Sequence, residues 1–240
     1  MRILITNDDG YSAEGIRALA LWAKKLGEVT VIAPKVEQSG KSHAIDFTRQ
    51  IEIKEVDEIP GVRTVYVDST PADCVRYAIL GEGEKYDLVL SGINRGVNMG
   101  VDLVYSGTCG AIFEAGRLGH RGIAFSAYYD TNFEAEAKEL DTIWSFIKKN
   151  DLLAENDLYN INIPKASKGI KVTKQGSAYF SDEFVRVDGD IFEQRGHKIE
   201  DVCPEDMSRD TVATEAGYIT ITPLMTTRTN MKVFEKLKNL

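Results

Sequence analysis

Residues 2–34 read RILITNDDGYSAEGIRALALWAKKLGEVTVIAP, with a short apolar run on either side of a helical pattern. The runs RILITN (2–7) and EVTVIAP (28–34) are typical of buried strands. Between them, apolar side chains recur at helical spacing, at Ile16, Leu19, Ala20, Ala23 and Leu26. We expect a helix over 12–26, with Ser12 as its N-cap and Gly27 after its last turn. A strand, a helix and a second strand in this order predict a parallel strand pair.

The same alternation continues through the first two thirds of the chain. Further strands are predicted at 63–67, 86–92, 122–127 and 158–164, and helices at 71–80, 108–118 and 133–149. The helix over 71–80 begins with Pro71, which suits a first helical turn. The pattern predicts an α/β fold with a Rossmann-like, mostly parallel sheet flanked by helices.

The pattern changes in the C-terminal third. Residues 165–209 contain short stretches of alternating character and the turn signal Asp188-Gly189, which predict a β-rich arm. Residues 218–224, YITITPL, alternate cleanly and predict a strand that returns to the sheet. A short, polar, helical tail is expected over 231–240. We therefore expect a single domain over 1–240 with an arm at 165–209.

Composition limits the classes of function. The 240 residues carry 29 Lys plus Arg against 37 Asp plus Glu, a formal net charge of −8, and the basic residues form no cluster beyond pairs. This balance argues against a protein that holds long nucleic acid by its phosphates, but it leaves a small phosphorylated ligand open.

Targeting and redox patterns favour a cytoplasmic protein. No signal peptide is expected, because two acidic residues follow the first short apolar run, and no run of about 18 apolar residues predicts a membrane span. Cys74, Cys109 and Cys203 are odd in number and widely spaced, which disfavours both a disulfide framework and a zinc site.

Asp8 and Asp9 follow the first strand directly and precede Gly10, where the chain can turn and bring both carboxylates toward one point. In an open parallel sheet, this carboxyl end of a strand is where ligands bind. Two converging carboxylates repel each other unless a cation joins them, and a hard ion such as Mg²⁺ or Mn²⁺ fits oxygen ligands. The alternative is a simple turn in which one Asp caps the following helix.

Residues 91–100, SGINRGVNMG, form a glycine-rich loop after another predicted strand. Its glycines would let the backbone approach a ligand, and Asn94 and Asn98 supply amide groups. The spacing does not match the dinucleotide fingerprint. The alternative is a connector with Asn in turn conformations.

Residues 105–110, YSGTCG, lead into a predicted helix. Its first turn would offer the backbone amides of Gly107, Thr108 and Cys109 beside small hydroxyl groups, which is a typical phosphate site. The alternative is ordinary N-capping by Ser106 or Thr108.

Three other patterns are weak. Gly40-Lys41-Ser42 suggests a P-loop, but Lys35 occupies the position of its first glycine. Cys203 and Arg209 have the spacing of cysteine-dependent phosphatases, but Pro204 removes an amide and the next two residues are acidic. The three histidines are isolated in sequence, and a structural or solvent-facing role fits them better than a catalytic one.

Together these blocks resemble the SurE (survival protein E) family of metal-dependent 5′/3′-nucleotidases. The resemblance covers ILITNDDG (3–10), VIAP (31–34) with QSGKS (38–42), STPADCV (69–75), SGINRGVNMGVDLVYSGTCGA (91–111) and GYITITPL (217–224), in the family's order. The chain departs from the family pattern at Ala44, Asp46, Ser69 and Cys109.

The resemblance implies roles for particular residues. The metal ligands would be Asp8, Asp9, Ser39 and Asn94, and the phosphate-binding residues would be Asn98, Ser106, Gly107 and Thr108. Asp8 is also the candidate to orient or deprotonate the attacking water.

The expected function is hydrolysis of nucleoside 5′- or 3′-monophosphates with one divalent ion, Mg²⁺ or Mn²⁺, and short polyphosphate is a further candidate substrate. The resemblance also implies a homodimer or homotetramer joined through the arm. Two alternatives stay open. An aspartate-nucleophile phosphatase of the haloacid dehalogenase type wants two acidic residues separated by one position, whereas Asp8 and Asp9 are adjacent. A nucleotide-binding regulator would keep the phosphate pocket without turnover.

Overall fold

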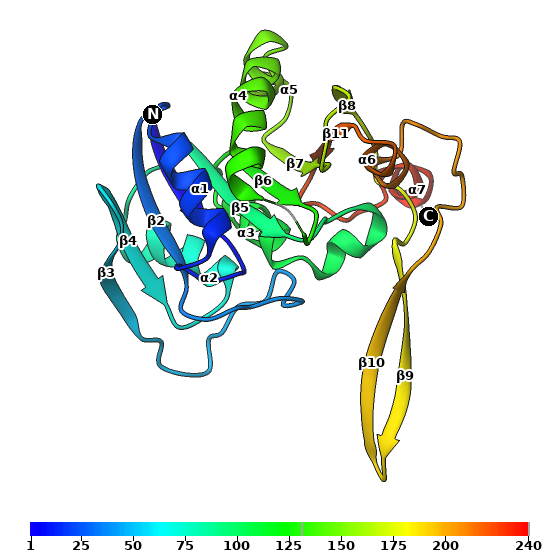
Figure 1. The fold of residues 1–240 in the computed structure, drawn as a ribbon, viewed down its shortest axis with the longest axis horizontal. Helices are drawn as coiled ribbons and strands as arrows, with labels where there is room; N and C mark the ends of the chain where they lie inside the picture. Colours follow the sequence, from blue (N-terminus) through cyan, green and yellow to red (C-terminus); the bar gives the residue numbers. More distant parts are fainter. Residues whose placement is uncertain (131, 240) are drawn as a thin grey trace.

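The computed structural model describes residues 1–130 and 132–239. Within them, the main sheet has nine strands in the order β3-β4-β2-β1-β5-β6-β7-β11-β8 (Figure 1). The strands are β1 (Arg2–Thr6), β2 (Glu28–Pro34), β3 (Ile53–Ile59), β4 (Val62–Val67), β5 (Leu88–Arg95), β6 (Gly122–Ala127), β7 (Leu158–Ile163), β8 (Ile170–Val172) and β11 (Ile219–Leu224). The run from β4 to β7 is parallel throughout, whereas β3 and β11 pair antiparallel with β4 and β7. The predicted mostly parallel sheet is confirmed.

Helices cover both faces of the sheet. The helical segments are α1 (Glu14–Ala23), α2 (Pro71–Arg76), η1 (Tyr77–Gly81), η2 (Gly100–Tyr105), α3 (Gly107–Arg117), α4 (Phe133–Lys149), α5 (Leu152–Glu155), α6 (Asp210–Glu215) and α7 (Met231–Leu237). Ile3 and Ile5 of β1 pack into the core under α1 and α4, whereas Leu4 packs into the core under α2 and α3. Because β1 is buried on both faces, it reads as a continuous apolar run.

The structure corrects several predicted boundaries. Helix α1 begins at Glu14 with Ala13 as its N-cap, so Ser12 is not the cap. The helix predicted over 71–80 is α-helical only to Arg76 and continues as the π-helical turn η1. Strand β5 runs on to Arg95, into the expected glycine loop. Four elements, β3, η2, α5 and α6, were not predicted; the exposed charged side chains of β3 match neither a buried nor an alternating strand pattern.

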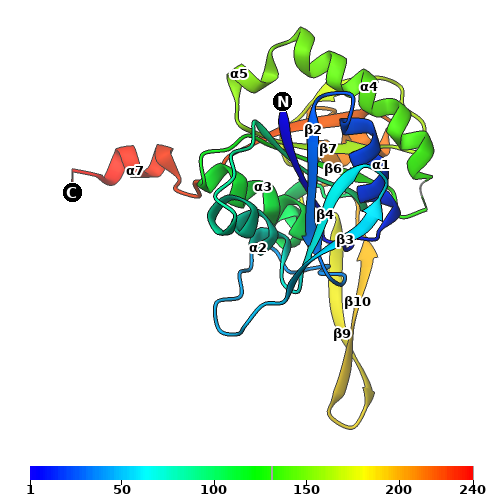
Figure 2. The same ribbon diagram turned by 90° about the vertical axis from the view of Figure 1, so that its left-hand side faces the viewer.

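A separate two-stranded hairpin, β9 (Phe180–Asp188) and β10 (Ile191–Lys198), projects from the body (Figures 1 and 2). It turns at the predicted Asp188-Gly189 signal, where Gly189 has a φ of +47°. The projecting part covers fewer residues than the expected arm at 165–209, because β8 joins the main sheet beside β11. Helix α7 extends from the body in another direction (Figure 2), and Leu240 at the end of the predicted tail lies outside the described residues.

No helix in the described ranges is both long and apolar enough to cross a membrane.

A cluster of basic side chains around the buried Glu114 fixes the loop that follows β2. The Glu114 carboxylate of α3 is 2% exposed and accepts hydrogen bonds from Arg76 at 2.9 Å and from Arg117 at 2.6 Å. It also lies 2.7 Å from Nε2 of His43, in the loop that carries Ser39. Burial raises the pKa of Glu114, but the bonds from His43, Arg117 and Arg76 outweigh it and lower the pKa to about 2. The cluster therefore ties the loop to α2 and α3.

We expect Glu114→Gln to lower the free energy of unfolding by about 3 kcal/mol at pH 7, because it removes the buried carboxylate charge that the partly exposed Arg76 and Arg117 stabilise. The folded-state pKa lies below the ordinary value of 4.5, so this stabilisation is complete above pH 4.5 and is lost as pH falls toward about 2. Urea unfolding of both proteins from pH 7 to pH ~3 should show the difference shrinking below pH 4.5.

Glu28→Gln is the matched control, because the Glu28 side chain is 74% exposed. It should change the free energy of unfolding by less than about 0.5 kcal/mol. A difference for Glu114→Gln that stays constant across the acidic range would contradict the proposed stabilisation by the charged cluster.

Candidate active site

The candidate site lies at the carboxyl ends of β1, β2 and β5 and at the start of α3. A tight turn presents the first two acidic residues. The Asn7 side chain donates to the Gly10 carbonyl at 2.9 Å and accepts from the Gly10 amide at 3.2 Å, and Gly10 has a φ of +103°. Glycine suits this backbone conformation, so the chain can turn sharply after Asp8 and Asp9.

Asp8 is buried against the first turn of α3. Its side chain is 4% exposed, and Oδ1 accepts a hydrogen bond of 2.6 Å from the Thr108 hydroxyl. The backbone amide of Thr108 also bonds to the carboxylate. A Cβ on Gly107 would lie 2.9 Å from the Asp8 Cβ, so only glycine allows α3 to come this close. Burial, opposed by the Thr108 bonds and assisted by the charge of Asp9, raises the pKa of Asp8 to about 6.

Asp9 is held from the neighbouring strand. The backbone amide of Arg95 donates to Asp9 Oδ2 at 3.2 Å. Burial raises the pKa of Asp9, and the negative charge of Glu37 adds to the shift. The loop after β1 therefore holds two carboxylates whose negative charges the surrounding protein compensates only in part.

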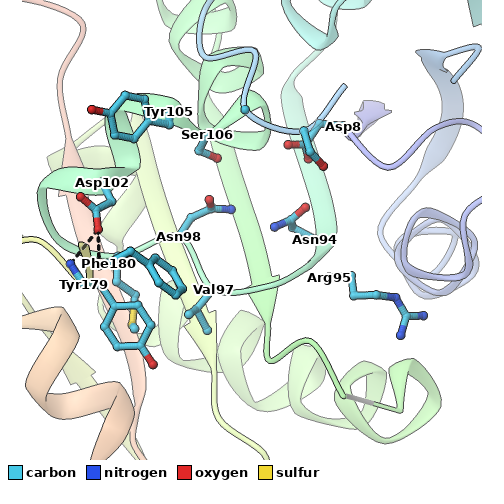
Figure 3. Close-up of a pocket in the computed structure, with 13 residues that line it drawn as sticks. Asp8, Asn94, Arg95, Val97, Asn98, Asp102, Tyr105, Ser106, Tyr179 and Phe180 are labelled. Atoms are coloured by element: carbon cyan, nitrogen blue, oxygen red, sulfur yellow. Dashed lines mark hydrogen bonds between the residues drawn. The ribbon is translucent and has the colours of Figure 1, made fainter. Parts of the chain in front are cut away.

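The structure brings the predicted metal ligands to two adjoining pockets. The first, here called the site pocket, has a volume of about 220 Å³ and is lined by Asp8, Ser39 and Asn94 among others. The second, of about 380 Å³, is lined by Asp9 and again by Ser39. The Asn94 amide donates through Nδ2 to the Gly96 carbonyl at 2.7 Å, and its oxygen turns toward Asp8 (Figure 3). The Ser39 hydroxyl donates to Glu37 at 2.6 Å.

The predicted phosphate residues are also close together, but they have different partners. Asn98 and Ser106 line the site pocket. Ser106 also caps α3, because its Oγ accepts from the Cys109 amide at 3.1 Å. Thr108 is fully buried and bonds to Asp8. Capping and ligand binding are therefore compatible at this helix start. One of its donors, the Thr108 hydroxyl, bonds to Asp8.

Two residues that position Asn98 were missed by the sequence analysis. Asn160 and Asn162 of β7 are fully buried and donate to the Asn98 carbonyl at 2.7 and 2.9 Å. The Asn162 side-chain oxygen also accepts from the backbone N–H of Asn98 at 2.8 Å. The Asn98 side-chain amide donates to the Ser126 hydroxyl at 2.8 Å. The available signal was two Asn residues alternating with Ile in an otherwise apolar strand.

The outer wall of the site pocket was also not predicted. It includes Tyr105 and Asp102 of η2 and Tyr179 and Phe180 at the start of the hairpin (Figure 3). Asp102 Oδ2 accepts from the backbone amides of Tyr179 at 2.7 Å and Phe180 at 2.8 Å. No local sequence pattern pairs residues almost 80 positions apart.

Across the described ranges, no three His, Cys, Asp or Glu side chains cluster as a metal site. A cation at Asp8 and Asp9 would therefore draw its further protein ligands from hydroxyl and amide oxygens, such as those of Ser39 and Asn94.

Comparison with known proteins identifies the family. Residues 3–182 match the family model described as survival protein SurE, a range that contains all eight predicted site residues. The chain is 40% identical over 255 residues to 5′-nucleotidase SurE of Aquifex aeolicus (strain VF5), covering 99% of this chain and 97% of that protein. It is 38% identical over 251 residues to 5′-nucleotidase SurE of Thermosipho africanus (strain TCF52B), covering 99% and 96%.

A solved structure agrees with this assignment. The crystal structure of the SurE protein from Aquifex aeolicus aligns with a TM-score of 0.83 and 36% identity, over 100% of this chain and 99% of that one. The predicted family and fold class are thus confirmed, and the shared name of the relatives supports the predicted enzyme class. The chain belongs to the SurE family.

Proposed function

We propose that this protein hydrolyses nucleoside monophosphates to nucleoside and phosphate with the help of one divalent metal ion. One observation carries the proposal: the buried Asp8 carboxylate lies against the start of α3, in the same pocket as Ser39, Asn94 and Asn98. A carboxylate pair beside a helix N-terminus offers ligands for a cation and donors for a phosphate at one place. The name 5′-nucleotidase of the relatives supports this substrate class.

The donor set fits Mg²⁺ or Mn²⁺. Asp8 and Asp9 bring two adjacent carboxylates whose pKa values are raised, chiefly by burial. Asn94 directs an amide oxygen toward Asp8, and Ser39 lines both pockets. All four are hard oxygen donors, the type that these ions prefer. A cation held by them would also relieve the repulsion between the two carboxylates.

The phosphate group would lie over the start of α3. The free donor capacity of this first turn and its helix dipole favour an anion, with Ser106 and the Gly107 backbone beside it. Asn98 is fixed by Asn160 and Asn162, so its contact with a phosphoryl oxygen would need little reorganisation.

The chain's own groups then account for hydrolysis. A divalent ion held by Asp8, Asp9, Ser39 and Asn94 would polarise phosphoryl oxygens and make water a better nucleophile at neutral pH. Asp8, held by Thr108, orients the attacking water and accepts its proton. The water oxygen forms a bond to phosphorus and the ester P–O bond breaks. The departing oxygen takes up a proton from solvent to give the nucleoside, and Asp8 releases the proton that it accepted to solvent. Asn98 and the start of α3 stabilise the negative charge that remains on the phosphate.

We propose a cytoplasmic location for the protein. The proposed activity also extends to 3′-monophosphates and to short polyphosphate. The same phosphate-binding groups can serve these substrates, since each presents a terminal phosphoryl group to the pocket.

We expect phosphate release from nucleoside monophosphates in Mg²⁺ or Mn²⁺ and none in EDTA. Asp9→Asn should lower kcat/KM at least ~100-fold, because it removes one of the two charges that hold the cation. Phosphate release from 5′- and 3′-monophosphates and tripolyphosphate measures this. Asp57→Asn, an exposed acidic residue on β3, is the matched control and should keep full activity.

Equal turnover in EDTA would contradict the proposed dependence of hydrolysis on a divalent metal ion. Nucleotide binding without turnover in any metal would instead favour a regulator. If the protein neither bound nor hydrolysed nucleotides, the chain would share the family's fold without its activity. Incorporation of labelled water oxygen into phosphate, with no trapped aspartyl-phosphate, distinguishes direct attack by water from attack by Asp8.

We also propose that the β9–β10 hairpin, the projecting part of the predicted arm at 165–209, joins copies of the chain into a homodimer or homotetramer. The projecting hairpin carries apolar side chains that the rest of the chain does not cover, with Phe184 71% and Ile191 65% exposed. Exposed apolar side chains concentrated on a projecting element are typical of an interface.

Replacing Phe184 and Ile191 together by Ser should lower the mass in solution, because it removes apolar surface from the proposed interface. Size-exclusion chromatography with light scattering measures this. The control is Leu80→Ser, which is 56% exposed in η1 and far from the hairpin in sequence. A wild-type protein that is a strict monomer would refute the role of the arm.

A further inference from the structure

The site pocket has two chemically different ends. Asp8, Asn94 and Ser106 form an oxygen-rich end, where the phosphate and metal are proposed to bind. The other end is formed by Tyr179 and Phe180 from the hairpin base, together with Val97 (Figure 3). A ligand that fills both ends needs an anionic group joined to a flat, weakly polar body.

The aromatic end is held in place by η2. Asp102 accepts the backbone amides of both Tyr179 and Phe180, at 2.7 and 2.8 Å. Just before them, Gln175 donates to the Gly100 carbonyl at 2.9 Å, and the carboxylate of the fully buried Asp210 accepts from the amides of Gly100 and Gly176. These bonds attach the start of the hairpin to the wall of the site pocket.

The two rings at this end differ in their surroundings. Tyr179 is 7% exposed, and its hydroxyl donates to Glu215. Phe180 is 47% exposed and has no polar group to bond, and its ring meets the Tyr179 ring edge-on with 4.9 Å between centroids. An open aromatic ring beside a phosphate site is a suitable surface for a nucleobase to stack on.

We infer that Phe180 stacks on the base of the nucleotide and that Asp102 is the positioning residue that holds Phe180 at the pocket. This inference rests on the proposed nucleotidase function and assigns it a preference for phosphate esters that carry a base. Stacking does not distinguish one base from another, so the preference extends over purines and pyrimidines.

The test compares a nucleoside 5′-monophosphate with ribose 5-phosphate, which has the same phosphate and sugar but no base. Phe180→Ala should raise KM for the nucleotide about 10-fold and leave KM for ribose 5-phosphate and both kcat values unchanged. Phe180→Trp should restore the nucleotide KM. Asp102→Ala should reproduce the effect of Phe180→Ala, because it frees the two backbone amides.

Phe192→Ala is the matched control, since Phe192 lies on the same hairpin and is also 47% exposed. It should leave both KM values unchanged. If it matched Phe180→Ala, the effect would come through assembly of the hairpin, and the inference would be wrong. The inference would also be wrong if Phe180→Ala raised KM equally for the nucleotide and for ribose 5-phosphate, or if it raised neither KM.

Binding measured by calorimetry separates this inference from the proposed function. If wild type turned over neither substrate, the nucleotidase proposal would fail. A nucleotide affinity that drops about 10-fold in Phe180→Ala, with the ribose 5-phosphate affinity unchanged, would still support base stacking. Equal nucleotide affinity in both proteins would overturn it.

Discussion

The contact between the Asp8 carboxylate and the first turn of α3 is the interaction on which the site depends. A carboxylate with 4% exposure needs partners inside the protein, and the hydroxyl and amide of Thr108 supply them. The absence of a side chain at Gly107 allows this approach. The negative charge of Asp9 opposes the effect of Thr108, because it disfavours the ionised form of Asp8 and raises the pKa of that carboxyl group. The result is a concentration of negative charge that a divalent cation would balance.

The order of the strands gathers the other groups around this contact. Strand β1 lies between β2 and β5, so Ser39 in the loop after β2 and Asn94 near the end of β5 flank Asp8 on either side. Farther along the sheet, β7 fixes Asn98 through two buried amides, and the Glu114 cluster fixes the loop after β2. The base of the hairpin closes the remaining wall. A ligand in this pocket therefore meets groups from five separate parts of the chain.

Sequence reasoning predicted most of the residues that the structure brings together at the candidate site, because these residues follow apolar strands or begin a helix. The turn at Asp8 and Asp9 and the start of α3 are local patterns, and the family resemblance added Ser39. The residues it missed act over long distances in sequence: Asn160 and Asn162 support Asn98, and Asp102 holds Phe180. The local patterns gave no indication that Thr108 would bond to Asp8 or that the Ser39 hydroxyl would donate to Glu37. Such pairings depend on which strands become neighbours, and short stretches of sequence do not specify that.

Binding of Mn²⁺ followed by electron paramagnetic resonance reports on the proposed cation site without any need for turnover. We expect one bound ion per chain and an affinity that falls at least ~10-fold in both Asp8→Asn and Asp9→Asn. Circular dichroism would establish that both variants remain folded. An Mn²⁺ affinity equal to that of wild type in the two folded variants would contradict a metal site built on this carboxylate pair.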